Sequence, residues 1–276
     1  MTMRIFIDET TKHHYVNSMS VGKGQPVILV HGLAASLRQW DLLIPKLIEA
    51  GFSAHALDLQ GHGDSAKPEE IEDYHIEAYF DQFTRWIDSL GFNGTPLSIV
   101  SHSLGAYLSL LFALRFPKRV QMLILTDPLY SPKQLSPFLR LAMRNPNPGI
   151  RILEKLPPWI FDLVLRWTEK TQRRVPTLIR RQLAIDFKRA SSLILYTTRT
   201  IRDITPQIPR IQVPSFVIWG KKDLTLSPRS FPRLARFLPQ ATSYNFPLCG
   251  HIPHLTEAAI YNQKVLDFIT GHPLLN

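Results

Sequence analysis

The pentapeptide Ser-His-Ser-Leu-Gly occupies residues 101–105, between an apolar run at residues 97–101 and a stretch with helical periodicity at residues 104–116. A serine on a tight turn from a strand into a helix has a strained backbone, and its hydroxyl projects from the sheet. Such a turn needs small residues two positions before and two after. Gly105 meets this requirement, and Ser101 stands where glycine is usual. We interpret Ser103 as a nucleophile; the alternative is an ordinary serine N-cap of the helix.

Strands and helices alternate on both sides of this turn. Helical patterns with apolar residues at i, i+3 and i+4 separate apolar, β-branched runs, which predicts an α/β fold with helices on both faces of a mostly parallel sheet. A hairpin from residues 4–7 and 14–19 is expected at the edge, which makes the sheet eight-stranded. The apolar runs are residues 26–31, 53–57, 97–101, 121–126, 214–219 and 242–246, and the helical patterns are residues 40–50, 76–90 and 104–116.

The alternation stops after residues 126–128 and resumes only at residue 213. An interruption of this length is too long for an ordinary loop, so it should carry its own helices and cover the sheet as a cap. We therefore predict a core domain from residues 1–128 and 211–276, with a helical cap at residues 129–210 inserted after the sixth strand.

Composition narrows the class of protein. The chain has 276 residues, 45% hydrophobic and 20% charged, which is typical of a globular protein with a sizeable core. A single cysteine, Cys249, excludes a disulfide framework or a thiolate metal site within the monomer.

Neither a signal peptide nor an apolar stretch of about 18 residues is evident, so we expect a cytoplasmic protein. The net charge of +10 is concentrated in residues 129–210, with 16 basic and 5 acidic residues.

Three candidate catalytic side chains follow predicted strands in the order Ser103, Asp223, His251. This order brings all three to the carboxyl edge of such a sheet. Asp127 is a rival acid because it closes the sixth strand, and His254 is a rival base. We favour Asp223, and we favour His251 because a glycine and an apolar strand precede it.

Two backbone N–H groups are candidates for an oxyanion hole. Leu33 follows His31-Gly32 at the end of the third strand, and Leu104 follows Ser103 at the turn. An N–H from each of these positions can point at one carbonyl oxygen.

Taken together, the motifs resemble those of the α/β-hydrolase fold superfamily, in its capped serine esterase or lipase-like branch. The resemblance covers almost the whole chain, through residues 31–32, 58–65, 101–105, 219–223 and 250–253. It implies that Ser103 is the nucleophile, His251 the general base and later acid, and Asp223 the carboxylate that orients the imidazole. It further implies an acyl-enzyme mechanism that requires no metal or organic cofactor.

His102 and Trp159 are the candidate substrate-binding side chains. His102 flanks the nucleophile and either lines the pocket or packs against the neighbouring strand. Trp159 lies in the densely apolar segment 156–167, part of which should face the cleft or a membrane surface. We interpret the arginine pairs at residues 173–174 and 180–181 first as a solvated face and second as a site of peripheral membrane association. No nucleic-acid partner is expected, because no binding motif accompanies the basic residues.

The leading functional hypothesis is hydrolysis of a carboxylic ester with an apolar acyl or alcohol part, which enters between cap and sheet. Hydrolysis of a carbon–carbon bond in a diketone-like acid is a second hypothesis on the same triad. A ligand receptor or slow hydrolase of this fold is a third. Ser103 argues against haloalkane dehalogenases and epoxide hydrolases, which resemble this fold but need an aspartate nucleophile. The physiological substrate and oligomeric state stay open.

Overall fold

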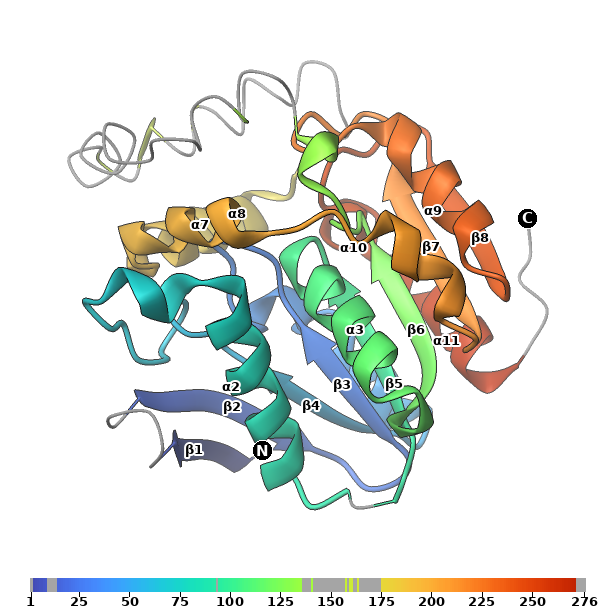
Figure 1. Ribbon diagram of the computed structural model, residues 1–276, viewed down its shortest axis with the longest axis horizontal. Helices are drawn as coiled ribbons and strands as arrows, with labels where there is room; N and C mark the ends of the chain where they lie inside the picture. Colours follow the sequence, from blue (N-terminus) through green and yellow to red (C-terminus); the bar gives the residue numbers. More distant parts are fainter. Residues whose placement is uncertain are drawn as a thin grey trace.

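The computed structural model describes residues 2–8, 14–92, 94–135, 140, 157, 159–160, 163 and 175–271. Eight strands form one sheet in the order β1-β2-β4-β3-β5-β6-β7-β8, which confirms the predicted fold class (Figure 1). β1 and β2 form an antiparallel hairpin at one edge, β2 pairs antiparallel with β4, and all other pairs are parallel. The strands are β1 Thr2–Asp8, β2 His14–Val21, β3 Pro26–Val30, β4 Ser53–Leu57, β5 Leu97–His102, β6 Val120–Thr126, β7 Ser215–Gly220 and β8 Ala241–Phe246.

Helices cover both faces of the sheet because its central strands are apolar on both sides. In β3, Ile28 and Val30 belong to the core cluster that contains α2 and α3, whereas Val27 and Leu29 belong to the cluster that contains α1 and α11. Figure 1 shows α2, α3 and α9 on one face and α11 on the other. The helices are α1 Ile44–Glu49, α2 Ile76–Ser89, α3 Leu104–Arg115, α9 Phe231–Phe237, α10 Pro253–Thr256 and α11 Ala258–Thr270.

One predicted helix is divided. The pattern at residues 40–50 predicts a continuous helix, but the structure has a 3-10 turn at Leu37–Trp40 followed by the short α1. Pro45 lies in the first turn of α1. Proline lacks an N–H and is tolerated only where a helix begins, so the α-helix starts at Ile44 and not at residue 40.

The chain between β6 and β7 contributes α7 Thr177–Arg189, α8 Thr197–Thr200 and 3-10 turns at Pro132–Gln134, Ser192–Tyr196 and Thr205–Arg210. Its later part is not separate from the core: Ile194, Ile201 and Ile208 are buried in the same cluster as α2 and α3. The helical content agrees with the predicted cap, whereas the predicted domain boundaries stay a prediction. The arginine pair at residues 173–174 lies outside the described residues.

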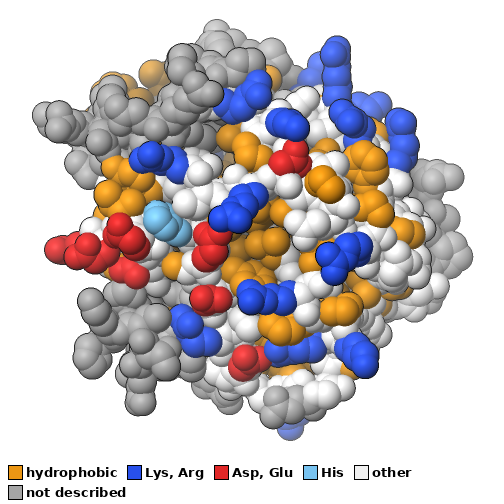
Figure 2. Space-filling model, in the orientation of Figure 1, with side chains coloured by type: hydrophobic (Ala, Val, Ile, Leu, Met, Phe, Trp, Pro, Cys, Tyr) orange, Lys and Arg blue, Asp and Glu red, His pale blue; other side chains and the backbone are white. Residues whose placement is uncertain are grey.

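Among the residues that the structure describes, none of the helices is long and apolar enough to cross a membrane. On the face seen in Figure 2, lysine and arginine side chains are spread among apolar side chains.

Candidate active site

The turn from β5 into α3 holds Ser103 in a strained backbone conformation. Its φ is +51° and its ψ is −111°, a region that side-chain-bearing residues rarely adopt. A Cβ on Gly105 would collide with the carbonyl oxygens of Val30 and His31, which explains the small residue at this position. Ser103 stands at the N-cap position of α3, but its hydroxyl caps no N–H group, so it is not an ordinary capping serine.

The structure brings Ser103, His251 and Asp223 together from three separate elements. His251 Nε2 lies 3.1 Å from Ser103 Oγ, and His251 Nδ1 lies 2.7 Å from Asp223 Oδ2. A carboxylate only accepts hydrogen bonds, so Nδ1 carries the proton and Nε2 offers its lone pair to the serine hydroxyl. This arrangement is the one a serine needs in order to lose its proton during attack on a carbonyl carbon.

Asp223 is fixed by the turn that follows β7. Its side chain is fully buried, and Oδ1 accepts hydrogen bonds from the N–H groups of Thr225 at 2.7 Å and Leu226 at 3.0 Å. A Cβ on Gly220, at the end of β7, would collide with the carbonyl oxygen of Gly250. The glycine therefore permits the close packing that sets the loop carrying His251 against the loop carrying Asp223.

Asp127, the rival acid, lies beside the triad without bonding to the imidazole. Its backbone has a φ of +41°, its side chain is fully buried, and Oδ1 accepts a hydrogen bond from the Gly220 N–H at 3.0 Å. Oδ2 has no hydrogen-bond partner among the described residues. Burial, and after it the neighbouring charge of Asp223, raises the pKa of Asp127 well above its usual range. The raised pKa favours the protonated form of Asp127, which lies next to the carboxylate that contacts His251.

His254, the rival base, is a packing residue. Its ring is 3% exposed and lies between Trp40 and His102, with centroids 5.2 Å and 4.7 Å away. Neither ring nitrogen has a hydrogen-bond partner among the described residues. Burial, followed by the nearby His251, lowers the pKa of His254 to about 3, so the ring is neutral near pH 7.

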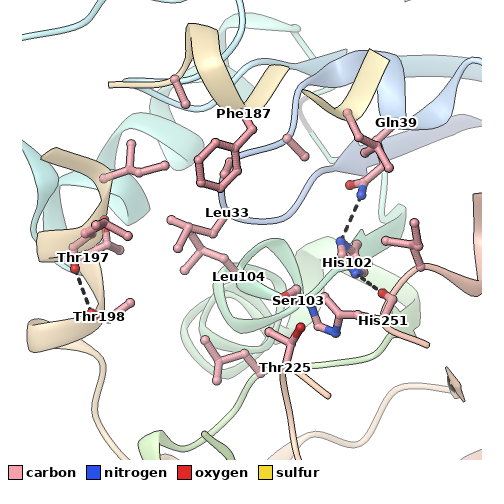
Figure 3. A pocket seen from close by; sticks show the side chains of 18 of the residues that line it. Leu33, Gln39, His102, Ser103, Leu104, Phe187, Thr197, Thr198, Thr225 and His251 are labelled. Atoms are coloured by element: carbon pink, nitrogen blue, oxygen red, sulfur yellow. Dashed lines mark hydrogen bonds between the residues drawn. The ribbon is translucent and has the colours of Figure 1, made fainter. Parts of the chain in front are cut away.

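A cavity of about 780 Å³ opens beside Ser103 (Figure 3). Its wall is mainly apolar: Leu104 and Leu33 come from the core, and Phe187 and Ala184 come from α7. The charged side chains on the wall are lysines and no described carboxylate lines it. The size falls in the range of about 300–1,000 Å³ typical of small-molecule sites.

Of the predicted oxyanion donors and substrate-binding residues, all but Trp159 line the cavity. Leu33 and Leu104 line the cavity together with Ser103, and their role as N–H donors stays a prediction. His102 also lines the cavity, but both of its ring nitrogens already have partners. Trp159 is 64% exposed and is not among the described residues on the cavity wall, so the structure does not support it as a pocket residue.

Two contributions to the site were missed from the sequence. Gln39 lies just before the stretch predicted as a helix, and nothing in its neighbours indicates that its amide reaches His102. The cavity wall from α7 lacks a sequence signal as well, because Phe187 is one apolar residue in a helix of mixed polarity. Both contacts join segments that are far apart in the chain.

Comparison with known proteins gives the same architecture. A family model described as the alpha/beta hydrolase fold matches residues 25–258. The bifunctional epoxide hydrolase 2 of Sus scrofa is 22% identical over 320 aligned residues, covering 96% of this chain and 54% of that protein. The chain thus spans about half the length of the epoxide hydrolases it matches.

Two further relatives match over nearly their full length. The putative carbamate hydrolase RutD of Variovorax paradoxus is 27% identical over 250 residues, covering 89% of this chain and 92% of that protein. A thermophilic esterase from Thermogutta terrifontis superposes with a TM-score of 0.81 at 21% identity, covering 98% of this chain and 99% of the other. At that identity the structural likeness is one of fold.

Proposed function

The chain belongs to the α/β-hydrolase fold family, and on that premise we propose that it is a serine hydrolase that cleaves a carboxylic ester with an apolar acyl or alcohol part. One observation carries the proposal: the hydrogen-bonded series Asp223, His251, Ser103 ends at a mainly apolar cavity of about 780 Å³. Family membership also confirms the resemblance inferred from the motifs.

In the proposed reaction, Ser103 Oγ attacks the ester carbonyl carbon as its proton passes to His251 Nε2. The carbonyl oxygen becomes an oxyanion, which accepts hydrogen bonds from the backbone N–H groups of Leu33 and Leu104. The tetrahedral intermediate expels the alcohol, and the alcohol takes the proton from His251. Water then enters, gives a proton to His251 and attacks the acyl-enzyme, releasing the acid and restoring Ser103. Asp223 stabilises the imidazolium in both halves of the reaction.

The apolar wall supports a substrate with a hydrocarbon part. Burial of hydrocarbon surface contributes about 25 cal/mol per Å², so a cavity lined by Leu104, Phe187 and Ala184 favours an aliphatic or aromatic group over a sugar or a peptide. The esterase and the putative carbamate hydrolase among the relatives fit a carbonyl substrate. The epoxide hydrolases fit less well, because Ser103 stands where that chemistry needs an aspartate.

Carbon–carbon bond hydrolysis of a diketone-like acid is the second candidate. Lys67 lines the cavity and offers a carboxylate a cationic partner. Lys67 Nζ is held at this position by the carbonyl oxygens of Gly63 at 2.9 Å and Ser65 at 3.2 Å. The same nucleophile, base and acid serve this reaction.

The basic residues that the structure describes in the 129–210 segment fit a solvated face better than a dedicated anion-binding surface. Lys133 forms an ion pair with Asp203, Arg189 with Asp64, and Arg202 with Glu77. Arg180 departs from the expected solvated face: it is only 7% exposed, and it donates to the carbonyl oxygen of Val175 at 3.4 Å. Membrane association through this segment is therefore the weaker proposal, and a nucleic-acid partner is not proposed.

The test combines active-site labelling with turnover. A fluorophosphonate should label Ser103 in the wild type and leave Ser103→Ala unlabelled, and p-nitrophenyl esters of graded chain length should be hydrolysed. Labelling without turnover of any ester, followed by cleavage of a diketone-like acid, would favour the second candidate. Labelling without turnover of either class would favour a receptor. A wild-type protein that is folded and unlabelled would overturn the nucleophile assignment.

A further inference from the structure

His102, the residue before the nucleophile, uses both ring nitrogens in hydrogen bonds to loops that meet at the site. It is 3% exposed, at the end of β5. Its Nε2 lies 2.7 Å from the backbone carbonyl oxygen of His251, and its Nδ1 lies 3.1 Å from Gln39 Nε2. Gln39 Oε1 in turn accepts the Gly32 N–H at 3.2 Å. Figure 3 shows the two contacts of His102 as dashed lines.

These contacts permit only one arrangement of protons. The carbonyl oxygen of His251 only accepts, so His102 Nε2 must donate. The Gly32 N–H only donates, so the Gln39 oxygen must face it and the Gln39 NH₂ must face His102. Nδ1 of His102 must then be the unprotonated acceptor. All three bonds are satisfied together only when the imidazole is neutral and carries its proton on Nε2.

The two ends of this series are the two loops that the proposed reaction needs. Gly32 immediately precedes Leu33, the proposed oxyanion donor, and His251 is the proposed base. The space between them is full: a Cβ on Gly32 would lie 2.6 Å from His102 Nδ1 and 3.2 Å from Ser103 Cβ. The His102 ring also packs against the ring of His251, with centroids 4.7 Å apart. A side chain at this position therefore sets the distance between the oxyanion loop and the base loop.

We propose that Gln39 and His102 form a hydrogen-bonded bridge that positions the Gly32–Leu33 loop and His251 relative to Ser103. The inference rests on the proposed function, and it assigns both residues as positioning residues that take no part in proton transfer. His102 is thus a spacer within the site, which differs from the substrate-binding role expected from the sequence.

The surroundings of His102 keep it in the neutral form that the bridge requires. Burial, followed by the neighbouring rings of His251 and His254, lowers the pKa of His102 well below its usual range. The charged or titratable groups that face it are His251, His254 in α10 and His31 after β3. A proton on Nδ1 would point at the Gln39 NH₂ and break the bond between them.

The experiment removes or reverses the bridge without touching the triad. Gln39→Leu deletes both contacts of the amide, and Gln39→Glu keeps an acceptor for Gly32 but faces Nδ1 with a second acceptor. Gln82→Leu is the matched control, because Gln82 is also a buried amide, 2% exposed, and its partner is Gln60 in another part of the core. Thermal unfolding of each variant reports the loss of stability separately from the loss of activity.

We expect both Gln39 variants to lose about 100-fold in kcat, more than any change in KM, because small displacements of reacting groups have effects of this size. Gln82→Leu should lose stability but retain kcat. His102→Phe should match Gln39→Leu, and the double variant should be no worse than the poorer single variant, because the residues act in series. Retention of wild-type kcat by a folded Gln39→Leu would overturn the bridge, since leucine fills the space but forms neither hydrogen bond.

A measurement on the wild type keeps the inference falsifiable if the variants do not fold. Histidine-selective isotope labelling and NMR should find His102 neutral and protonated on Nε2 near pH 7; protonation on Nδ1 would overturn the assignment. Failure of the proposed function has a different signature. In that case the wild type itself would show neither labelling nor turnover, whatever the tautomer of His102.

Discussion

Replacing Asp223 by asparagine reverses the hydrogen bond that holds the imidazole. The carboxylate accepts the proton on His251 Nδ1 at 2.7 Å, whereas an amide nitrogen in that place donates. The ring then turns its lone pair toward residue 223 and presents an N–H to Ser103, so it cannot take the hydroxyl proton. A wrong tautomer of this kind costs roughly 10⁴-fold in kcat, and we expect a loss of about that size.

Asp127→Asn is the control matched to Asp223→Asn, and we expect it to retain most of the wild-type kcat. Burial and, after it, the neighbouring Asp223 raise the pKa of Asp127 well above its usual range, which favours the protonated carboxyl. An amide keeps an oxygen for the Gly220 N–H, which now bonds to Asp127 Oδ1 at 3.0 Å. The substitution therefore changes neither the charge nor the turn, and kcat should fall only a few-fold.

Asp127→Asn also tests the charge state of Asp127, because that state affects how the stability of the wild type changes with pH. A raised pKa means that the unfolded chain releases its proton first, so wild-type stability falls as pH rises from the ordinary aspartate pKa toward the raised pKa of Asp127. Each unit by which folding raises the pKa of Asp127 lowers the free energy of unfolding by about 1.4 kcal/mol at a pH above both the unfolded-state and the folded-state pKa. Asp127→Asn has no proton to lose there, so its stability relative to the wild type should increase with pH across this window.

Steady-state kinetics on a p-nitrophenyl ester and urea unfolding at several pH values make the two measurements. If Asp127→Asn loses as much kcat as Asp223→Asn while both fold, Asp127 is the acid of the triad and the reasoning is refuted. If the difference in unfolding free energy between Asp127→Asn and the wild type does not change with pH, the neutral form of Asp127 is wrong.

Three further outcomes are expected. Ser103→Ala should lower kcat by about 10⁶-fold while circular dichroism and the unfolding midpoint stay close to wild type; residual hydrolysis near the wild-type rate would refute the nucleophile. Gly105→Ala should lower the free energy of unfolding by at least about 2 kcal/mol, because its Cβ would collide with the Val30 carbonyl oxygen. The control Gly91→Ala has nothing within 4 Å and should cost only about 1 kcal/mol for its φ of +75°; equal losses in urea unfolding would contradict the crowding argument. Ala184→Trp should reduce the cavity and lower kcat/KM for long-chain p-nitrophenyl esters relative to short ones, and an unchanged ratio would remove α7 from the acyl site.

Sequence patterns predicted the framework well because they report burial. A run such as 26–30 is apolar at every position since helices cover both sides of the strand, and such runs placed the buried strands β3 to β7. The run at residues 242–246 placed β8, which is only partly buried. The turn at residues 101–105 was visible for a similar reason: the backbone there is crowded, and crowding selects small residues. The helix predicted at residues 40–50 was wrong in extent, because Pro45 permits a helix start and not a helix interior.

Patterns were less informative where the outcome depends on contact between distant segments. Asp127 and Asp223 each follow a strand, and both are buried. Only Asp223 forms a hydrogen bond with His251. The local sequence favoured Asp223 but did not exclude Asp127. The choice depends on the turn after β7, whose N–H groups at Thr225 and Leu226 hold the carboxylate.

Local residue chemistry was therefore enough to identify three features. Hydrophobic periodicity indicated the α/β class, the small residues of a crowded turn indicated the strained serine, and a glycine before a histidine indicated the candidate base. Each of these signals extends over only a few residues. Contacts between segments that are not adjacent in the chain decided the rest. They placed Asp223, and not Asp127, against the imidazole of His251, gave both ring nitrogens of His102 a partner, and built an apolar wall from α7. The physical reason is that hydrogen-bond polarity and cavity shape are properties of groups that meet only after the sheet has formed.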